Sequence, residues 1–244
     1  MLSKLYFCFV LCLLIPSTVV AESDWHWLHP YPTGFHIEGI STPDGNSIFV
    51  VTSFGEIICS TDGGETWEVQ QQNGDVLSDI CSINGSEAWA CGRSPSYSTE
   101  GIIWRTTDGG EIWQDQTFED ERFTGVEFID SSYGTVVGYN GAIYRSNNGG
   151  SSWNAQGSPG SDHLYGVSFI SPTQGWVCGA GAVFYTETSG AFWEELTTPG
   201  SEYYYGIHFL DENNGFLASA SDIYRTDNGG DSWTSTGMVP PLNY

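Results

Sequence analysis

An eight-residue pattern that occurs five times is the feature that most constrains the fold of this chain. Its first copy reads Ser-Thr-Asp-Gly-Gly-Glu-Thr-Trp, and the copies begin at residues 60, 106, 146, 186 and 226. Each copy ends in a tryptophan, and successive tryptophans are 46, 40, 40 and 40 residues apart. A fixed period near 40 residues is typical of one supersecondary unit copied in tandem. The repeat therefore predicts the architecture of nearly the whole chain.

Aligning the copies exposes four short apolar segments in each unit. In the third unit these segments are 125–129, 134–138, 142–145 and 152–155. They are rich in Val, Ile and aromatic residues and are bounded by Gly, Asn, Asp and Ser, which is typical of strands joined by tight turns. No stretch has a helical period. Four antiparallel strands in every unit predict an all-β fold, namely a β-propeller with five four-stranded blades.

We expect one propeller domain over residues 22–244, because a single four-stranded sheet needs neighbouring blades to bury both of its faces. Trp25 and Trp27 precede the first unit in a segment that resembles a blade's outer strand, which leaves the closure of the ring open. Part of a larger ring is the alternative. The expected blades are 34–72, 73–118, 119–158, 159–198 and 199–238.

Residues 1–21 predict a secretory signal peptide. Lys4 supplies a positive charge, residues 5–15 are apolar, and residues 19–21 offer a small-residue cleavage site. The apolar run is too short for a membrane-spanning helix, and no later segment is long enough either. We therefore expect an exported protein, periplasmic or extracellular, without a membrane span.

The charge balance is strongly acidic. The chain has 30 acidic residues against six basic ones, and its formal net charge is −24. Such a surface repels nucleic acid and anionic lipid, and favours cationic partners. Solubility alone is the alternative explanation.

Export would permit disulfides between the four cysteines that follow the signal peptide. Cys81 and Cys91 flank a turn around residues 84–87, so a bridge across a hairpin is one hypothesis. The alternative is that both are small buried apolar residues, because Cys178 occupies the repeat position of Cys91 without a comparable partner. No cysteine and histidine cluster has zinc spacing.

The repeated pattern resembles the Asp-box, or BNR, repeat of sialidases and other propeller proteins. The longer unit at 126–150 is similar to that of the photosystem II stability and assembly factor propellers, over nearly all of the chain after residue 21. Members of that family typically have more blades, so five is a departure. The resemblance implies a non-catalytic propeller that binds a protein partner during assembly.

The Asp-box residues have a structural explanation in the turn between the third and fourth strands. Their Asp or Asn can accept backbone N–H bonds, glycine supplies positive φ, and tryptophan fills the space between blades. A calcium site would need more oxygen ligands than one turn provides, so no metal or cofactor is expected. The predicted structural set is Asp62, Trp67, Asp108, Trp113, Asn148, Trp153, Trp193, Asn228 and Trp233.

Propeller topology places the links between blades on the side opposite the Asp-boxes, and binding residues usually lie on such loops. Four units carry an acid just before the inner strand, followed by aromatic residues, which would suit a cation, a basic peptide or a sugar. Solvated acids on a chain that is acidic throughout are the alternative. The candidate binding face is Asp75, Arg93, Glu121, Arg122, Asp162, His163, Tyr165, Glu202 and Tyr204.

Arg105, Arg145 and Arg225 each directly precede a copy of the pattern, so they are a candidate basic arc for a partner. The alternative is that each guanidinium pairs with nearby acids such as Asp108 or Asp227.

Catalysis is not expected. A sialidase needs several arginines around the substrate carboxylate, and only Arg93 and Arg122 lie on the candidate face. Another glycosidase would need two carboxylates about 5 to 9.5 Å apart. The sequence therefore favours a non-catalytic propeller with an unidentified protein partner, and a carbohydrate-binding or sialidase-like hydrolytic propeller with a glycan ligand is the alternative.

Overall fold

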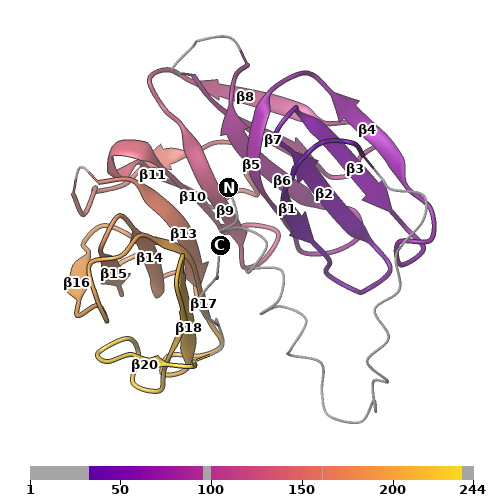
Figure 1. Cartoon of the computed structure of the whole chain (residues 1–244). Helices are drawn as coiled ribbons and strands as arrows, with labels where there is room; N and C mark the ends of the chain where they lie inside the picture. Colours follow the sequence, from indigo (N-terminus) through magenta and orange to yellow (C-terminus); the bar gives the residue numbers. More distant parts are fainter. Residues whose placement is uncertain (1–32, 96–99, 161, 238–244) are drawn as a thin grey trace.

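The computed structural model describes residues 33–95, 100–160 and 162–237, so the predicted signal peptide, Trp25 and Trp27 lie outside the described residues. The described residues form twenty β-strands in five four-stranded antiparallel sheets, and within each sheet the strands follow chain order (Figure 1). These sheets confirm the prediction of an all-β fold with five blades.

The strand bounds define the five blades. Blade 1 contains β1 (Ile37–Ser41), β2 (Ile48–Thr52), β3 (Glu56–Ser60) and β4 (Glu68–Gln72). Blade 2 contains β5 (Val76–Ser82), β6 (Ala88–Arg93), β7 (Gly101–Thr106) and β8 (Gln114–Phe118). Blade 3 contains β9 (Phe123–Phe128), β10 (Gly134–Gly138), the 3-10 turn η2 (Tyr139–Gly141), β11 (Ile143–Ser146) and β12 (Asn154–Ala155). Blade 4 contains β13 (Leu164–Phe169), β14 (Gly175–Gly179), β15 (Val183–Thr186) and β16 (Glu194–Leu196). Blade 5 contains β17 (Tyr204–Phe209), β18 (Gly215–Ser219), β19 (Ile223–Thr226) and β20 (Thr234–Ser235).

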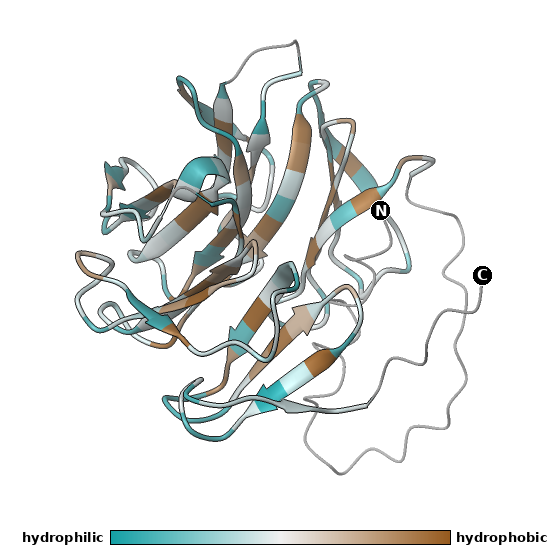
Figure 2. Ribbon diagram, turned by 60° about the vertical axis from the view of Figure 1, so that its left-hand side comes forward, coloured by the Kyte–Doolittle hydropathy of each residue, from teal (hydrophilic) through white to brown (hydrophobic). Residues whose placement is uncertain are grey.

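The blades are arranged in an arc. The inner strands pack in the order β1, β5, β9, β13 and β17, and within the described ranges no comparable packing joins β17 back to β1. Figure 1 shows the arc running from β1–β4 on the right to β17–β20 at the lower left. Apolar and polar residues alternate along the strands, as the brown and teal bands in Figure 2 show. Two-faced strands of this kind bury apolar side chains against the blades on either side.

Stacked aromatic rings fill the interfaces between blades. Trp89 of β6 stacks on Phe128 of blade 3 at 3.6 Å, and its indole Nε1 donates to the Gly149 carbonyl over 3.0 Å. Trp176 of β14 stacks on Phe209 of blade 5 at 3.6 Å in the same way. Both tryptophans are fully buried. Stacking adds about 1 kcal/mol to the burial of each ring, so these pairs hold neighbouring blades in a fixed relation.

Glycine at the start of the second strand makes room for the aromatic ring of the inner strand. A Cβ atom on Gly175 would lie 2.4 Å from the Phe169 ring, and one on Gly134 would lie 2.2 Å from the Phe128 ring. Blade 2 has Ala88 at this position, and it pairs with Ser82 instead of a phenylalanine. The residue types at the two paired positions therefore change together from blade to blade.

A second interface contact recurs along the inner strands. In each of the first four blades, one side chain of the inner strand accepts the backbone N–H of a residue on the next inner strand. The acceptor and donor pairs are Ser41 with Ser82, Cys81 with Phe128, Glu127 with Phe169, and Ser168 with Phe209. The inner strands of successive blades are thus joined by polar as well as apolar contacts.

The hypothesis of a Cys81–Cys91 disulfide is wrong. Cys81 lies directly opposite Trp89, and Cys91 lies opposite Asp79, so the two cysteines are not cross-strand partners. Cys81 and Cys91 are thiols, as are Cys59 and Cys178. Cys81 instead accepts the Phe128 N–H over 3.3 Å, which places its sulfur at the interface with blade 3.

Candidate functional site

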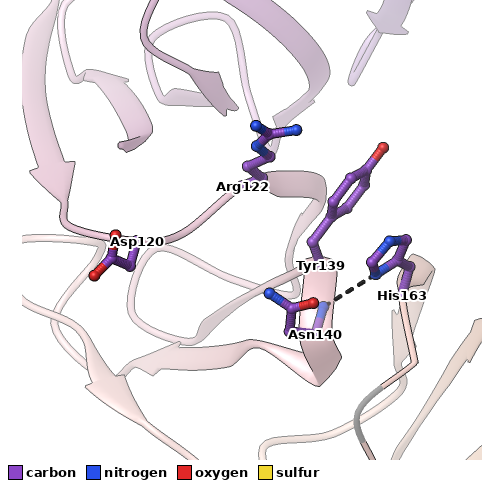
Figure 3. A pocket seen from close by; sticks show the side chains of 5 residues that line it. All are labelled: Asp120, Arg122, Tyr139, Asn140 and His163. Carbon is purple, nitrogen blue, oxygen red and sulfur yellow. Dashed lines mark hydrogen bonds between the residues drawn. The ribbon is translucent and has the colours of Figure 1, made fainter. Parts of the chain in front are cut away.

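A pocket of about 340 Å³ opens on the side where the links between blades lie. It is lined by residues from three segments: the link before β9, the turn η2, and the link before β13 (Figure 3). The lining residues are Asp120, Arg122, Tyr139, Asn140 and His163. Arg122 and His163 belong to the candidate binding face that the sequence predicts, so the structure brings two of its members together.

Local backbone geometry positions the pocket residues. Asn140 has a φ of 57°, a left-handed conformation that asparagine tolerates better than most residues. Tyr139 is anchored by its N–H, which donates to the Arg122 carbonyl over 2.9 Å. The N–H of Asn140 donates to His163 Nδ1 over 3.2 Å, drawn as a dashed line in Figure 3. Because Nδ1 is the acceptor, the neutral imidazole carries its proton on Nε2 and can donate there.

Aromatic rings continue from the pocket across three blades. Tyr139 and His163 stack at 3.9 Å, and the Arg122 guanidinium carbon lies 5.8 Å from the centre of the Tyr139 ring. His163 meets the edge of Tyr165 at 6.5 Å. Tyr165 in turn lies 5.5 Å from Tyr205, whose ring stacks with that of Tyr203 at 6.4 Å. We call Tyr139, His163, Tyr165, Tyr203 and Tyr205 the aromatic path.

The aromatic path is partly open to solvent. The side chain of Tyr203 is 54% exposed, and Tyr139, His163 and Tyr165 are half-buried. Burial is the main reason that the pKa of Tyr165 is raised, and its neighbouring tyrosines add to the effect. Rings of this kind present a large apolar area with polar tips, which suits the side chains and backbone of a peptide.

Two residues of the predicted binding face are buried, so they cannot contact a ligand there. Asp75 is 5% exposed and accepts the indole N–H of Trp104 over 2.8 Å, and burial raises its pKa. Tyr204 is fully buried, and its hydroxyl donates to the Gly200 carbonyl over 2.8 Å. Strand alternation explains why the prediction for Tyr204 is wrong: Tyr203 and Tyr205 point to the opposite face of the strand.

Two other acids of the predicted face, Glu121 and Glu202, accept hydrogen bonds from residues of their own blades. Glu121 accepts the hydroxyl of Tyr144 over 2.9 Å. Glu202 accepts the Ser221 hydroxyl over 2.6 Å, and hydrogen bonds from Ser219 and then Ser221 lower its pKa. Asp162 is exposed. Arg93 ends β6 and is half-buried, beside a loop of which residues 96–99 lie outside the described ranges.

Sequence reasoning missed Tyr139, Asn140 and Asp120. The available signal was the Asn140-Gly141 dipeptide, which marks a turn whose residues take positive φ. Within a repeat this turn lies between the second and third strands, on the side of the blade links. It therefore belongs to the candidate face.

The predicted basic arc is not a continuous exposed surface. Arg105 donates from Nη1 to the Ser151 hydroxyl of the next blade over 2.9 Å. Arg145 is 7% exposed, and its guanidinium lies 4.2 Å from the centre of the Phe169 ring of blade 4. Only Arg225 among the three is exposed. Arg105 and Arg145 therefore contact the next blade, whereas Arg225 belongs to the last described blade.

The repeat turns, defined as residues 60–67, 106–113, 146–153, 186–193 and 226–233, carry internal hydrogen bonds. In the first turn, Asp62 Oδ1 accepts the N–H of Thr66 over 2.9 Å and the hydroxyl of Ser60 over 2.7 Å. Hydrogen bonds, led by that from the Thr66 hydroxyl, lower the pKa of Asp62 to about 2. Asn148 and Asn228 accept the equivalent N–H bonds. Among the described residues, no group of His, Cys, Asp and Glu side chains is arranged to hold a metal ion.

Comparison with known protein families shows which family this chain belongs to. A family model described as photosynthesis system II assembly factor YCF48 matches residues 18–158 and 117–239. The chain belongs to this family. It is 30% identical over 126 residues to the photosystem II assembly lipoprotein Ycf48 of Synechococcus sp. (strain CC9902), a match that covers 48% of this chain. The chain spans about a third of that relative's length, since the match covers 35% of it.

Solved structures share the fold. The structure of YCF48 bound to D1 peptide is 18% identical and has a TM-score of 0.63, covering 83% of this chain and 67% of that one. An ancestral GH74 enzyme is 15% identical with a TM-score of 0.65, covering 88% of this chain and 33% of the enzyme. Within residues 33–95, 100–160 and 162–237, the chain has no helix of the length and apolarity that a bilayer crossing requires.

Proposed function

We propose that this chain is a non-catalytic assembly factor that binds a segment of a partner protein on the side of the blade links. The observation that carries the proposal is the aromatic path beside the pocket, with Arg122 at one end. Membership of the YCF48 family supports a role in assembly, and one solved structure is of YCF48 bound to D1 peptide. The exposed rings and guanidinium are the residue types that dominate protein recognition sites.

The chemistry of the site favours a peptide. Stacked tyrosines offer apolar faces to side chains, and their hydroxyls and His163 Nε2 offer hydrogen bonds to a peptide backbone. Arg122 is exposed and can pair with a carboxylate of the partner. Basic side chains of the partner would be attracted by the acidic chain around the site and by the ring faces.

Several observations support the absence of catalysis. Of the acids that the sequence offers for glycoside hydrolysis, Asp75 is buried, and Glu121 and Glu202 accept hydrogen bonds within their own blades. The likeness to GH74 enzymes is below 25% identity and supports the fold alone. We accordingly propose no reaction at this face.

We also propose that the protein is exported, because residues 1–21 have the pattern of a signal peptide and the Synechococcus relative is named a lipoprotein. The repeat turns then serve as scaffold, since their Asp and Asn side chains are used within the turns.

Peptide binding to the aromatic path tests the proposed function. The probe is a fluorescently labelled D1 peptide, and fluorescence anisotropy measures its dissociation constant. We expect Tyr203→Ala and Arg122→Ala each to weaken binding by about tenfold, the usual effect of truncating a central contact. Phe192→Ala is the matched control, because Phe192 is an aromatic side chain that is 69% exposed in a repeat turn on the other side. Equal binding by all three variants and the original protein would place the peptide elsewhere.

A further inference from the structure

His163 joins blade 4 to the turn η2 of blade 3. It directly precedes β13, and its carbonyl accepts the N–H of Ala180, in the turn between β14 and β15, over 3.0 Å. Its backbone therefore belongs to blade 4. Its ring instead reaches blade 3, where Nδ1 accepts the Asn140 N–H over 3.2 Å and the imidazole stacks on Tyr139 with an angle of 10° between the planes (Figure 3). The His163 ring thus supports Tyr139 at the blade 3 end of the aromatic path.

The corresponding turn of blade 4 satisfies its backbone in another way. Four residues separate β10 from β11 in blade 3, whereas three separate β14 from β15 in blade 4. In the shorter turn, the N–H of Gly181 donates to the Gly179 carbonyl over 2.9 Å, so this bond is made within the turn. The Asn140 N–H leaves its own turn and meets an imidazole of the next blade. This use of a histidine is therefore a feature of the boundary between blades 3 and 4, beside the pocket.

Protonation of His163 would remove this acceptor. A neutral imidazole accepts at one nitrogen, whereas an imidazolium donates from both. A proton on Nδ1 would face the proton of the Asn140 N–H, and two donors repel each other instead of bonding. An imidazolium is attracted to the face of a tyrosine ring, but keeping its stack on Tyr139 would hold Nδ1 against the Asn140 N–H. The two contacts that the neutral ring makes together therefore become incompatible, and the ring must move away from η2.

The charged groups beside His163 do not replace the lost hydrogen bond. Arg122 lines the same pocket and would oppose a second cation there, whereas the carboxylates of Asp120 and Asp162 would attract it. Both acids are exposed, so water screens their attraction. The titratable and charged residues nearest the ring, from the links before β9, β13 and β17 and from η2, are Asp120, Arg122, Tyr139, Asp162, Tyr165 and Tyr203.

We propose that His163 is a positioning residue that holds the aromatic path ready for a peptide while its imidazole is neutral, and that acidification weakens peptide binding by protonating this ring. The inference rests on the proposed function, because the aromatic path is where the peptide binds. In the neutral state, the Asn140 N–H fixes the ring through Nδ1, and Nε2 is left to donate to the peptide backbone. In the charged state the ring leaves η2, so Tyr139 and Tyr165 no longer belong to one continuous surface.

Fluorescence anisotropy of the labelled D1 peptide at constant ionic strength tests this inference, from about pH 8 to about pH 5.5, the range in which histidine ordinarily gains a proton. We expect the dissociation constant to be about tenfold larger at the acidic end, because a hydrogen bond and an aromatic contact together correspond to about this factor. Circular dichroism at both ends of the range checks that the protein stays folded. In a ¹⁵N-labelled sample without peptide, the NMR resonance of the Asn140 amide should shift over the same range, because its N–H loses the imidazole acceptor.

Substitutions of histidine identify the group that titrates. His163→Asn keeps an oxygen that can accept the Asn140 N–H but gains no proton in this range, so the tenfold difference between the two pH values should disappear. His163→Phe keeps a ring for Tyr139 but has neither the acceptor nor the charge, and its binding should also be independent of pH. His36→Asn is the matched control, because His36 is an exposed histidine that directly precedes β1 as His163 precedes β13. This variant should keep the pH dependence of the original protein.

Three results would overturn this inference and leave the proposed function standing. One is peptide binding that is equally tight, or tighter, at the acidic end of the range. Another is a pH dependence that His163→Asn retains in full, because a different group would then be responsible. The third is an Asn140 resonance that does not move with pH, because this would separate the turn from the imidazole. Absence of binding at pH 8 would instead overturn the proposed function, and the regulation inferred here with it.

Discussion

Glu127 is a half-buried residue whose carboxyl group should make the stability of the propeller depend on pH. It lies on β9, at the interface of blade 3 with blade 4, where it accepts the Phe169 N–H. Thr135 of β10 pairs with Glu127 on one side and with Arg145 of β11 on the other. Burial is the main cause that raises its pKa to about 8, with Asp79 adding to the rise and Arg145 opposing it. The folded protein therefore holds Glu127 protonated at pH values where an unfolded chain would ionise it.

The sign and size of the effect follow from proton linkage. Below the ordinary pKa of 4.5 the carboxyl group is protonated in both states, and above about 8 it is ionised in both. Between these values the unfolded state releases the proton first, so the free energy of unfolding falls as pH rises. At about 1.4 kcal/mol for each pH unit, the full loss is on the order of 5 kcal/mol. That is a large part of the stability of an ordinary domain, which is about 5 to 15 kcal/mol.

Glu127→Gln isolates this contribution, because the amide is neutral and its oxygen can still accept the Phe169 N–H. Urea unfolding at several pH values from 4.5 to 9 measures the free energy of unfolding of both proteins. We expect similar stability near pH 4.5 and a growing advantage for Glu127→Gln as pH rises. Glu194→Gln, the same change at an exposed outer-strand position, should leave the pH dependence unaltered. A constant difference between the original protein and Glu127→Gln across this range would refute the reasoning.

Three further predictions concern the interfaces between blades. Gly175→Ala should destabilise the protein by about 1 to 3 kcal/mol in urea unfolding, because its Cβ would lie 2.4 Å from the Phe169 ring; no loss in this variant would contradict the packing. Trp176→Phe should cost about 1 kcal/mol through loss of the bond to the Gly229 carbonyl, and Trp176→Ala about 3 to 5 kcal/mol, so equal costs would rule out the stacking role. Ellman's reagent should react slowly with the native protein, because burial raises the pKa of Cys59 to about 11 and that of Cys81 to about 12. Once the protein is unfolded, the reagent should react with all four cysteines after residue 21. If the unfolded protein had two reactive thiols fewer than this, a disulfide between Cys81 and Cys91 would have to be reconsidered.

The repeat made the fold predictable because its signal is periodic and local. Five copies of one turn, each following a short apolar strand, define the strand order without any knowledge of long-range contacts. The same alignment shows which residues are equivalent between blades, and thereby explains why Gly175 accompanies Phe169 where Ala88 accompanies Ser82. Closure was not predictable in this way, because it depends on the first and last blades, which have no repeat on one side.

The candidate site was predictable only as a side of the molecule. The rule that blade links share one side correctly brought Arg122 and His163 together, but it could not separate buried from exposed residues within one link. Asp75 is buried because Trp104 of the same blade donates to it, and Tyr204 is buried because strand alternation turns it away from Tyr203. Both facts depend on register, which a repeat alignment does not supply.

Comparing equivalent positions of the repeat explains why the residue type at one inner-strand position differs between blades. The acceptor position of the inner strand holds Ser, Cys, Glu, Ser and His in blades 1 to 5, and in the first four it meets the same N–H donor of the next blade. Because the side chain at this position only has to accept a hydrogen bond, different residue types that can accept one can occupy it. Glu127 is the only carboxyl group among these five side chains, and Arg145 near it is buried. The variation within the repeat therefore marks a pH-sensitive interface inside the arc, between blades 3 and 4.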